Sequence, residues 1–394
     1  MGKTRMAKTG NEAMAEAIRQ INPDVVAAYP ITPATEVMQI FATYVADGLV
    51  DTELVPTESE HSAMSAAIGS QIAGARTMTA TSSQGLALMY EMLYIAAGLR
   101  LPLIMAEVNR ALSAPINIHC DHSDTMGGRD AGWIQIFSEN SQEAYDNLIQ
   151  AVRIAEHRDV LLPIMVTTDG FIISHAMEAM EIYNDKDVRD FIGTYKPLQP
   201  ALDYRKPITV GAIDFVDYYF EHRRAVAQAM TNAKDVILEV GREFGRKFGQ
   251  EYGFYEAYKL DDAEVAMVCL GSTAGTGKDA IDNLRKRGIK AGLLKLRVFR
   301  PFPAEELAAR LSGVSQICVL DRSDALAATG GPLFTELLAA MYEDRSEHKI
   351  INRIYGLGGR DIKVEEIEEL LSAQVSAAAG GKSIDRIAYH GVRE

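Results

Sequence analysis

The first 170 residues alternate short apolar runs with segments of helical periodicity, and this alternation constrains the fold most. It is typical of an α/β protein with an open, mainly parallel sheet and helices on both faces. The predicted strands end in polar or glycine-containing segments at residues 29–33, 82–85, 109–133 and 168–170. Because the carboxyl ends of parallel strands share one edge of a sheet, these four segments are expected to lie together there.

The longest of these segments, residues 109–133, follows the apolar run 102–108 and has no helical or alternating periodicity. It contains two Arg, two His, three Asp, two Asn and the only Trp of the chain. A strand-fed loop with so many titratable groups is a favoured place for chemistry in α/β proteins. The alternative is a surface loop held by its own ion pairs.

Residues 30–33, Pro-Ile-Thr-Pro, predict the start of a helix. Thr32 supplies a hydroxyl at the N-cap, and Pro33 takes the first helical position, where its missing N–H costs nothing. The free backbone N–H groups of such a start, together with the helix dipole, can bind an anion. Capping alone is the simpler interpretation, and both can hold.

Two acids, Glu58 and Glu60, stand at the start of a predicted helix that is rich in Ala, Ser and Gly over residues 62–74. Acids in the first turn interact favourably with the helix dipole and stabilise the helix by a few tenths to about 1 kcal/mol. In this interpretation their role is purely structural. A buried acid directed at a cofactor is the functional alternative, and the residues alone leave both open.

From about residue 182 the chain becomes rich in Tyr, Asp, Lys and Arg, and one long polar helix is predicted from 217 to 248. A buried strand at 263–270 begins a smaller α/β domain, with further strands at 291–298 and 316–321 and a helix at 364–372. The glycine-rich turn 271–278 is not a phosphate loop, because Asp279 follows Lys278 where Ser or Thr is required. We therefore assign residues 1–235 to a first domain, 236–262 to a connector and 263–394 to a second domain.

The bulk composition excludes several classes of protein. The net charge of −14 argues against nucleic acid or an anionic membrane as the main partner. The chain has no apolar run of 18 residues and no signal peptide, so a cytoplasmic location is expected. Its three cysteines are far apart and form no Cys-x-x-Cys, so this polypeptide cannot itself bind an iron–sulfur cluster through four thiolates.

Seven short sequence motifs together point to a known family, and they lie at residues 10–13, 29–33, 58–61, 81–85, 109–119, 121–124 and 295–303. With these motifs, nearly the whole chain resembles the α subunits of multi-subunit 2-oxoacid:ferredoxin oxidoreductases. The segment Asn-Arg-Ala-Leu-Ser-Ala-Pro at 109–115 is the most specific, and it favours the branch that acts on pyruvate or branched-chain 2-oxoacids.

The resemblance implies a fold and a set of partners. Residues 1–235 would be a pyrimidine-type thiamine-diphosphate-binding domain, and residues 263–394 a transketolase-C-like domain with a C-terminal tail. A β subunit would carry the diphosphate half with its Mg2+, and [4Fe-4S] clusters would lie in partner subunits, among them a γ subunit and a ferredoxin-like δ subunit. The chain contains no Gly-Asp-Gly motif and no cysteine cluster, which agrees with this division. Alone it would be inactive.

The resemblance also suggests roles for single residues. Glu60 is the candidate for the carboxyl that hydrogen-bonds the aminopyrimidine ring, with Glu58 as its competitor. Arg110 and Thr32 would bind the carboxylate of the 2-oxoacid, for which a planar guanidinium is suited. Further cofactor contacts are expected from Pro30, Ile31, Ser83, Gln84 and Gly85. A weaker set could serve the site or only lock the loop against a partner subunit: Asn117, His119, Asp121, His122, Asp124 and Arg129. No metal site is predicted, because no spacing matches a known ligand set.

The expected reaction is the reversible, coenzyme-A-dependent oxidative decarboxylation of pyruvate, with ferredoxin as the electron acceptor. The same chemistry on 2-oxoisovalerate is the close alternative, since the two substrates differ only in apolar bulk. A non-catalytic scaffold subunit of the same fold is the alternative of another class.

Overall fold

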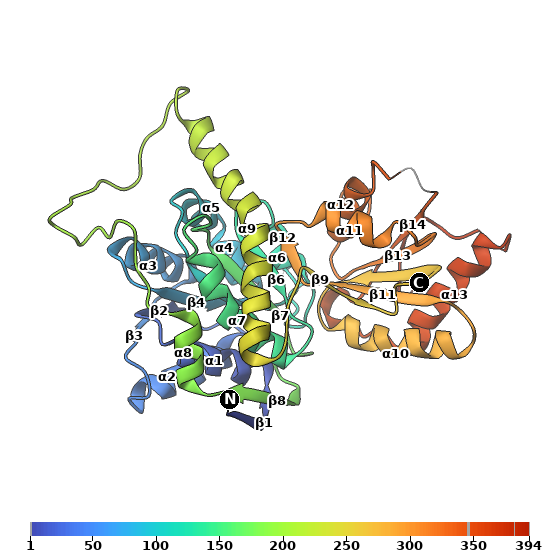
Figure 1. Ribbon diagram of the computed structural model, residues 1–394, viewed down its shortest axis with the longest axis horizontal. Coiled ribbons are helices and arrows are strands. Elements are labelled where there is room, and N and C mark those ends of the chain that lie inside the picture. Colours follow the sequence, from blue (N-terminus) through green and yellow to red (C-terminus); the bar gives the residue numbers. More distant parts are fainter. Residues whose placement is uncertain (1, 345–346, 382, 394) are drawn as a thin grey trace.

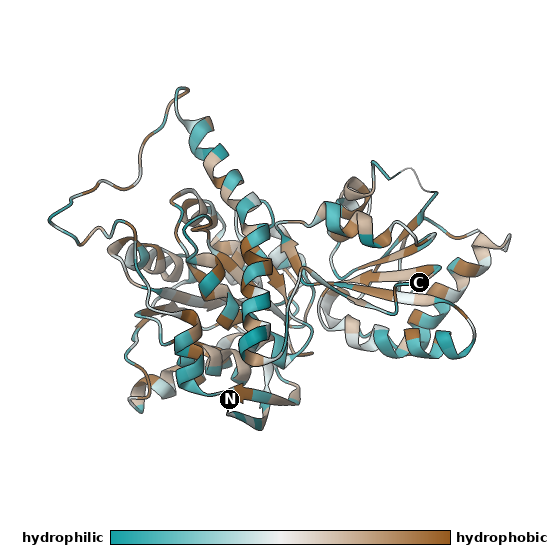
Figure 2. Ribbon diagram, viewed as in Figure 1, coloured by the Kyte–Doolittle hydropathy of each residue, from teal (hydrophilic) through white to brown (hydrophobic). Residues whose placement is uncertain are grey.

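The computed structural model describes residues 2–344, 347–381 and 383–393. The chain forms a large lobe and a smaller one, each built around its own sheet (Figure 1). Strands at the centres of both sheets are apolar, whereas the outward sides of the helices that cover them are polar (Figure 2). This confirms the predicted α/β class with two separately packed sheets.

The sheet of the large lobe has seven strands in the order β12-β6-β7-β5-β4-β2-β3. All neighbouring pairs are parallel except β12 with β6. The strands are β2 (Val25–Ala28), β3 (Glu53–Pro56), β4 (Thr77–Thr81), β5 (Ile104–Asn109), β6 (Ile134–Phe137), β7 (Ile164–Asp169) and β12 (Val298–Arg300). A separate antiparallel pair joins β1 (Lys3–Thr9) to β8 (Met177–Tyr183).

Helices cover both faces of this sheet, because its central strands are apolar on both sides. One core packs against α1 (Gly10–Ile21), α2 (Thr35–Ala46), α7 (Ser141–Ala155), α8 (Asp185–Ile192) and α9 (Tyr219–Phe248). The opposite core packs against α3 (Glu60–Ala73), α4 (Ser83–Leu88) and α5 (Tyr90–Gly98). The short α6 (Ser123–Gly127) lies within the loop that follows β5.

The long helix α9 confirms the prediction of one long polar helix, and it carries one apolar stripe. Its buried side chains recur every three or four residues from Val226 to Phe248 and join the core of the large lobe. Phe220, in the first turn of α9, lies outside this stripe and is 77% exposed. It belongs to a segment we call the arm, residues 193–220, which leaves the body after α8 and returns at the first turn of α9 (Figure 1).

The second sheet has six strands in the order β15-β14-β13-β10-β11-β9. They are β9 (Tyr255–Tyr258), β10 (Val265–Cys269), β11 (Ala291–Leu296), β13 (Gln316–Asp321), β14 (Lys349–Ile354) and β15 (Ile387–Tyr389), and only β9 is antiparallel. Its helices are α10 (Thr273–Lys286), α11 (Ala304–Leu311), α12 (Pro332–Ala340) and α13 (Val364–Ala378), with a 3-10 turn η1 (Leu357–Gly359).

Two local predictions are wrong. The helix after β2 begins at Thr35 with Ala34 as its N-cap, not with Thr32. The carbonyls of Thr32 and Pro33 are instead held by side chains of Arg110 and Asn11, so this segment stays outside the helix. The predicted strand 291–298 is in fact two strands, because the chain crosses from the second sheet to the edge of the first at Arg297.

None of the described helices combines the length and the apolar composition that a membrane span would need.

Candidate active site

The carboxyl ends of β2, β4, β5 and β7 meet at one edge of the large sheet, as predicted, and the loops they feed are tied together there. The guanidinium of Arg110 is the central side chain. Its Nε donates to the carbonyl of Asn117 and its Nη1 to the carbonyl of Thr32, each at 2.9 Å. Arg110 is only 7% exposed, and within the described residues it forms no ion pair. A nearly buried cation whose partners are neutral carbonyls is suited to bind an anion.

Asp124 on α6 holds these loops in place. Its Oδ2 accepts the backbone N–H of Ser83 at 3.0 Å and of Arg110 at 2.8 Å. Its Oδ1 accepts from Asn109 Nδ2 and from the backbone N–H of Thr125. Burial raises the pKa of Asp124, while the four N–H donors oppose this shift. Asp124 therefore joins the ends of β4 and β5. It contributes to the site by holding the backbone of Ser83 and Arg110 in place.

The structure separates the two competing acids. Glu58 is exposed and accepts a hydrogen bond from Ser62, which lowers the pKa of its carboxyl. Glu60 is the first residue of α3, is 7% exposed, and its carboxylate has no hydrogen-bond partner among the described residues. Ser59 caps the helix instead. Glu60 is thus the acid of the pair that is placed to meet an added polar group.

Gly85 makes the position of Glu60 possible. A Cβ on Gly85 would lie 2.9 Å from Glu60 Oε1 and would also collide with Thr81 Oγ1. The same turn is held by Ser83, whose Oγ lies 2.6 Å from the carbonyl of Ala111 and 2.7 Å from Gln84 Oε1. The carboxylate of Glu60 therefore reaches the start of α4 only because residue 85 lacks a side chain.

The remaining members of the first predicted set occupy the edge of the site. Pro30 is exposed and Ile31 is half-buried, and both directly precede the exposed Thr32 at the end of β2. The predicted hydroxyl cap at Thr32 is wrong, as described above, but its carbonyl orients Arg110.

The weaker predicted set mainly ties the loop to the second domain of this chain. Asn117 Nδ2 donates to the carbonyl of Gly358, and Asp121 Oδ2 accepts the N–H of the same residue. His119 is exposed, with its ring 5.0 Å from that of Phe171. Arg129 donates to the carbonyl of Met126.

His122 belongs to a buried charge cluster between the domains. Its Nε2 lies 2.7 Å from Asp169 Oδ1, and Asp169 Oδ2 lies 3.2 Å from Arg322 Nη1. The backbone N–H of Ser272 also donates to Asp169. Burial opposes the ionisation of Asp169, but His122 and Arg322 outweigh it and hold its pKa below its usual range. The cluster joins the end of β7 to the second domain.

Two groups of side chains have the composition of metal ligands, but in each group a cationic side chain already pairs with the carboxylates. Cys120 lies with His122 and Asp169 beside Arg322. Glu139, Glu143 and Glu256 surround Lys295, whose Nζ is 2.5 to 3.0 Å from each of them, and Lys278 pairs with Glu139 and Glu256. Lys278, in the glycine-rich segment, is thus engaged in structural ion pairs.

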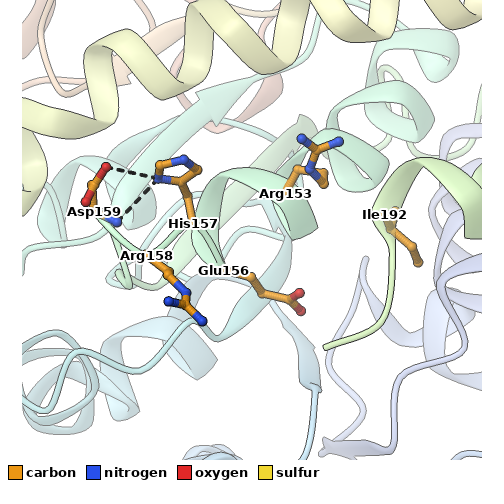
Figure 3. A pocket seen from close by; sticks show the side chains of 6 residues that line it. All are labelled: Arg153, Glu156, His157, Arg158, Asp159 and Ile192. Atoms are coloured by element: carbon orange, nitrogen blue, oxygen red, sulfur yellow. Dashed lines mark hydrogen bonds and ion pairs between the residues drawn. The ribbon is translucent and has the colours of Figure 1, made fainter. Parts of the chain in front are cut away.

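A surface pocket lies elsewhere, between the end of α7 and the start of β7 (Figure 3). It is lined by Arg153, Glu156, His157, Arg158, Asp159 and Ile192, and His157 Nδ1 accepts the backbone N–H of Asp159. Because it precedes β7, it is at the amino-end edge of the sheet, opposite Arg110. It contains none of the predicted site residues.

Sequence reasoning missed three residues that shape the site. Asn11 donates to the carbonyl of Pro33, Asn109 donates to Asp124, and Asp169 joins the domains. Asn11 lies in the 10–13 motif and Asn109 lies at the end of a predicted strand. These positions were the sequence features that could have indicated a role in the site. Nothing in the sequence connects Asp169 to Arg322, which lies 153 residues away.

Comparison with known proteins agrees with this geometry. The family described as pyruvate flavodoxin/ferredoxin oxidoreductase, thiamine-diphosphate-binding, matches residues 16–242, and pyruvate:ferredoxin oxidoreductase core domain II matches residues 263–367. The fold and the site thus define a chain of the thiamine-diphosphate-binding oxidoreductases. More particularly, the chain belongs to the pyruvate flavodoxin/ferredoxin oxidoreductase family.

Curated relatives narrow this further. Pyruvate synthase subunit PorA of Thermotoga maritima is 53% identical over 390 residues, covering 99% of this chain and 98% of that protein. The PorA subunit of Methanocaldococcus jannaschii is 48% identical over 92% of this chain and 93% of its own length. Ketoisovalerate oxidoreductase subunit VorA of Pyrococcus abyssi is 43% identical over 96% and 95%.

A solved structure shares the fold. The 2-oxoglutarate:ferredoxin oxidoreductase from Magnetococcus marinus superposes with a TM-score of 0.74 at 21% identity. The match covers 94% of this chain and 65% of that one.

Proposed function

We propose that this chain is the subunit of a coenzyme-A-dependent pyruvate:ferredoxin oxidoreductase that binds the pyrimidine half of thiamine diphosphate and the carboxylate of the 2-oxoacid. The observation that carries the proposal is the guanidinium of Arg110, nearly buried and without an ion-pair partner among the described residues, at the sheet edge where Glu60 is also unpartnered. The names of the curated relatives support pyruvate as the substrate.

The residues of this edge fit the cofactor. Glu60 offers a carboxylate that no other described side chain uses, and Gly85 leaves space beside it. In the proposal this carboxylate hydrogen-bonds the aminopyrimidine ring and holds or accepts a proton there, which a dry site strengthens. Ser83, Gln84, Pro30 and Ile31 form the surrounding edge. When bound, thiamine diphosphate supplies the carbanion-stabilising centre that lets a 2-oxoacid lose carbon dioxide.

Arg110 binds and orients the substrate. Two of its N–H groups are fixed by the carbonyls of Thr32 and Asn117, so the plane of the guanidinium is set before the substrate arrives. The remaining donors can form two parallel hydrogen bonds with a carboxylate. Such preorganisation reduces the entropy lost on binding.

The rest of the enzyme would be supplied by other chains. In the proposal a β subunit carries the diphosphate-binding half with Mg2+, and γ and ferredoxin-like δ subunits complete the complex. The [4Fe-4S] clusters lie in these partners and pass electrons to ferredoxin. The complex works in the cytoplasm, and this chain is inactive without its partners.

A second substrate has a specific observation behind it. A relative named ketoisovalerate oxidoreductase subunit VorA is 43% identical over 96% of this chain, close to the values for several PorA relatives. The alternative function is therefore the same reaction on 2-oxoisovalerate. An apolar pocket separates two such substrates by about 1–3 kcal/mol per methylene.

The test uses the native complex, purified through a tag on this chain and supplied with thiamine diphosphate, Mg2+ and coenzyme A. Reduction of a low-potential acceptor is followed with pyruvate, 2-oxoisovalerate and 2-oxoglutarate in parallel. We expect the highest kcat/KM with pyruvate; a preference for 2-oxoisovalerate would move the chain to the branched-chain alternative. No turnover by a complex with intact clusters would favour a non-catalytic scaffold.

The variant Glu60→Gln tests the role of this chain within that complex. We expect it to lower kcat by at least a hundredfold, the usual contribution of a proton-transfer group, while Glu58→Gln stays near wild type. Equal losses in both variants, or none in Glu60→Gln, would contradict the assignment.

A further inference from the structure

A buried polar layer lies directly beneath the site, on the sheet face that α3 and α4 cover. At its centre is Glu107 on β5, a single acid inside an apolar strand, fully buried. The register places Thr81 of β4 on one side of it and Thr167 of β7 on the other. Both carboxyl oxygens of Glu107 and both threonine hydroxyl oxygens are buried without a hydrogen-bond partner in the described part of the chain.

Asp124 has the opposite environment, although the two carboxyl groups are neighbours. Four N–H groups donate to Asp124, which stabilises its ionised form. Glu107 accepts no comparable set of hydrogen bonds. Burial first, and then the charge of Asp124, raise the pKa of Glu107 well above its usual range. Of these two neighbouring acids, Glu107 therefore has the surroundings that favour the protonated form, and Asp124 has those that favour the ionised form.

Among the residues that the structure describes, no cation pairs with Glu107. Beyond Thr79 and Thr81, β4 leads to Gly85 and the carboxyl of Glu60 on α3. From β7, Asp169 is the nearest acid along the strand, and it is paired with Arg322. From β6, Gln135 contributes a neutral amide. In the described chain no Lys, Arg or His forms an ion pair with Glu107.

We propose that Glu107 is a positioning residue that stays protonated, so that the carboxylate of Asp124 has no second charge directly beside it and keeps its hydrogen bonds to the backbone N–H groups of Arg110 and Ser83. Once protonated, Glu107 gains a hydroxyl that can donate to the neighbouring carboxylate of Asp124, which gives its otherwise unpartnered carboxyl a hydrogen bond. Ionisation of Glu107 would place a second buried charge beside Asp124, and the repulsion would loosen the backbone that presents the Arg110 guanidinium. This inference rests on the proposed function, because Glu107 acts on the substrate only through Arg110.

The test compares three variants in the intact complex, by KM and kcat for the 2-oxoacid between pH 6 and pH 9.5. Glu107→Gln keeps a neutral hydrogen-bond donor of the same shape, and Glu107→Met keeps the volume without the donor. Arg110→Lys in the same series reports on the proposed function. A thermal melt of each complex checks assembly.

We expect KM of the wild-type complex to rise at alkaline pH, and this rise to be absent in Glu107→Gln, whose KM at pH 7 stays within twofold of wild type. Glu107→Met should raise KM about tenfold with little change in kcat. A tenfold KM increase in Glu107→Gln, or wild-type behaviour of Glu107→Met, would overturn the inference. If Glu107→Met does not assemble, the alkaline profile of Glu107→Gln decides. An unchanged KM in Arg110→Lys would instead contradict the proposed substrate role, whatever the Glu107 variants show.

Discussion

Asp169 and Arg322 form a buried ion pair across the two domains, with Oδ2 and Nη1 3.2 Å apart and side chains that are 0% and 3% exposed. Asp169 ends a strand of the large sheet and Arg322 follows a strand of the small one. The orientation of the second domain is therefore linked to the strand edge that carries the site. His122 adds a third member from the loop that contains Arg110.

The first prediction concerns this pair. Asp169→Asn leaves the buried guanidinium of Arg322 without its counter-charge, and we expect a loss of about 3–5 kcal/mol. Because the pKa of Asp169 is held low, the contribution is present above the pKa of an unfolded aspartate, about 4, and is lost as the pH falls through the lower folded value. The thermal midpoint of the complex should thus drop at pH 7 and converge with wild type in acid. Asp190→Asn, an exposed ion-pair control, should change nothing measurable. A difference that grows, rather than shrinks, as the pH falls below about 4 would contradict the mechanism.

The second prediction concerns substrate binding by Arg110. Arg110→Lys keeps the charge but loses the planar pair of donors, and it also loses one of the fixed contacts to Thr32 and Asn117. We expect KM for the 2-oxoacid to rise at least tenfold, since a charged hydrogen bond contributes about 1.5–3 kcal/mol. Steady-state kinetics of the complex provide the measurement. Arg158→Lys, at the far edge of the sheet, serves as control and should keep the wild-type KM.

The third prediction concerns Gly85. Its replacement by Ala places a methyl group against Thr81 and Glu60, so the Glu60 carboxylate must move. We expect weaker thiamine diphosphate binding and at least a tenfold loss of kcat/KM, measured by cofactor titration of the apo complex. Gly98→Ala adds the same methyl group at an exposed helical position, where no described atom beyond its chain neighbours and its own helix backbone lies within 4 Å, and it should behave as wild type. Unaltered cofactor affinity in Gly85→Ala would remove Glu60 from the pyrimidine site.

The fourth prediction concerns Asp146 on α7, which is buried and accepts a hydrogen bond from Tyr252 at 2.6 Å. Burial raises the pKa of Asp146 to about 7. The folded state therefore holds a proton that the unfolded chain releases near pH 4, and stability declines as the pH rises through 7. Asp146→Asn removes this titration, which is worth on the order of 4 kcal/mol at most. The melting temperature of the variant relative to wild type should increase between pH 5 and pH 8, and a constant difference would contradict the assignment.

Much of the large sheet could be predicted from sequence because its strands are continuous apolar runs that end in polar segments. The segments after β2, β4 and β5 carry Thr32, Ser83 and Arg110, and the structure brings these loops together. Local pattern was sufficient here because parallel topology places all carboxyl strand ends at one edge.

The rest depends on contacts that local pattern does not encode. Thr32 and Pro33 look like a helix start, but donors 22 and 78 residues away in sequence hold their carbonyls. The sequence does not reveal that the chain passes at Arg297 from the second sheet to the edge of the first. Strands of both sheets need the same apolar residue types, so the two strands look like one apolar run. Glu107 did leave a signal, an acid inside a buried strand, yet its meaning required the environment of Asp124 to be known.

The arm has a consequence for how the chain is made. Between residues 198 and 220 eleven large apolar side chains are exposed: Leu198, Leu202, Tyr204, Ile208, Val210, Ile213, Phe215, Val216, Tyr218, Tyr219 and Phe220. A monomer seldom exposes so much apolar surface in one contiguous segment without a tendency to aggregate. We therefore expect synthesis of this polypeptide to be matched in amount and timing to that of its binding partners, with the surplus removed by proteases that cut first in the arm.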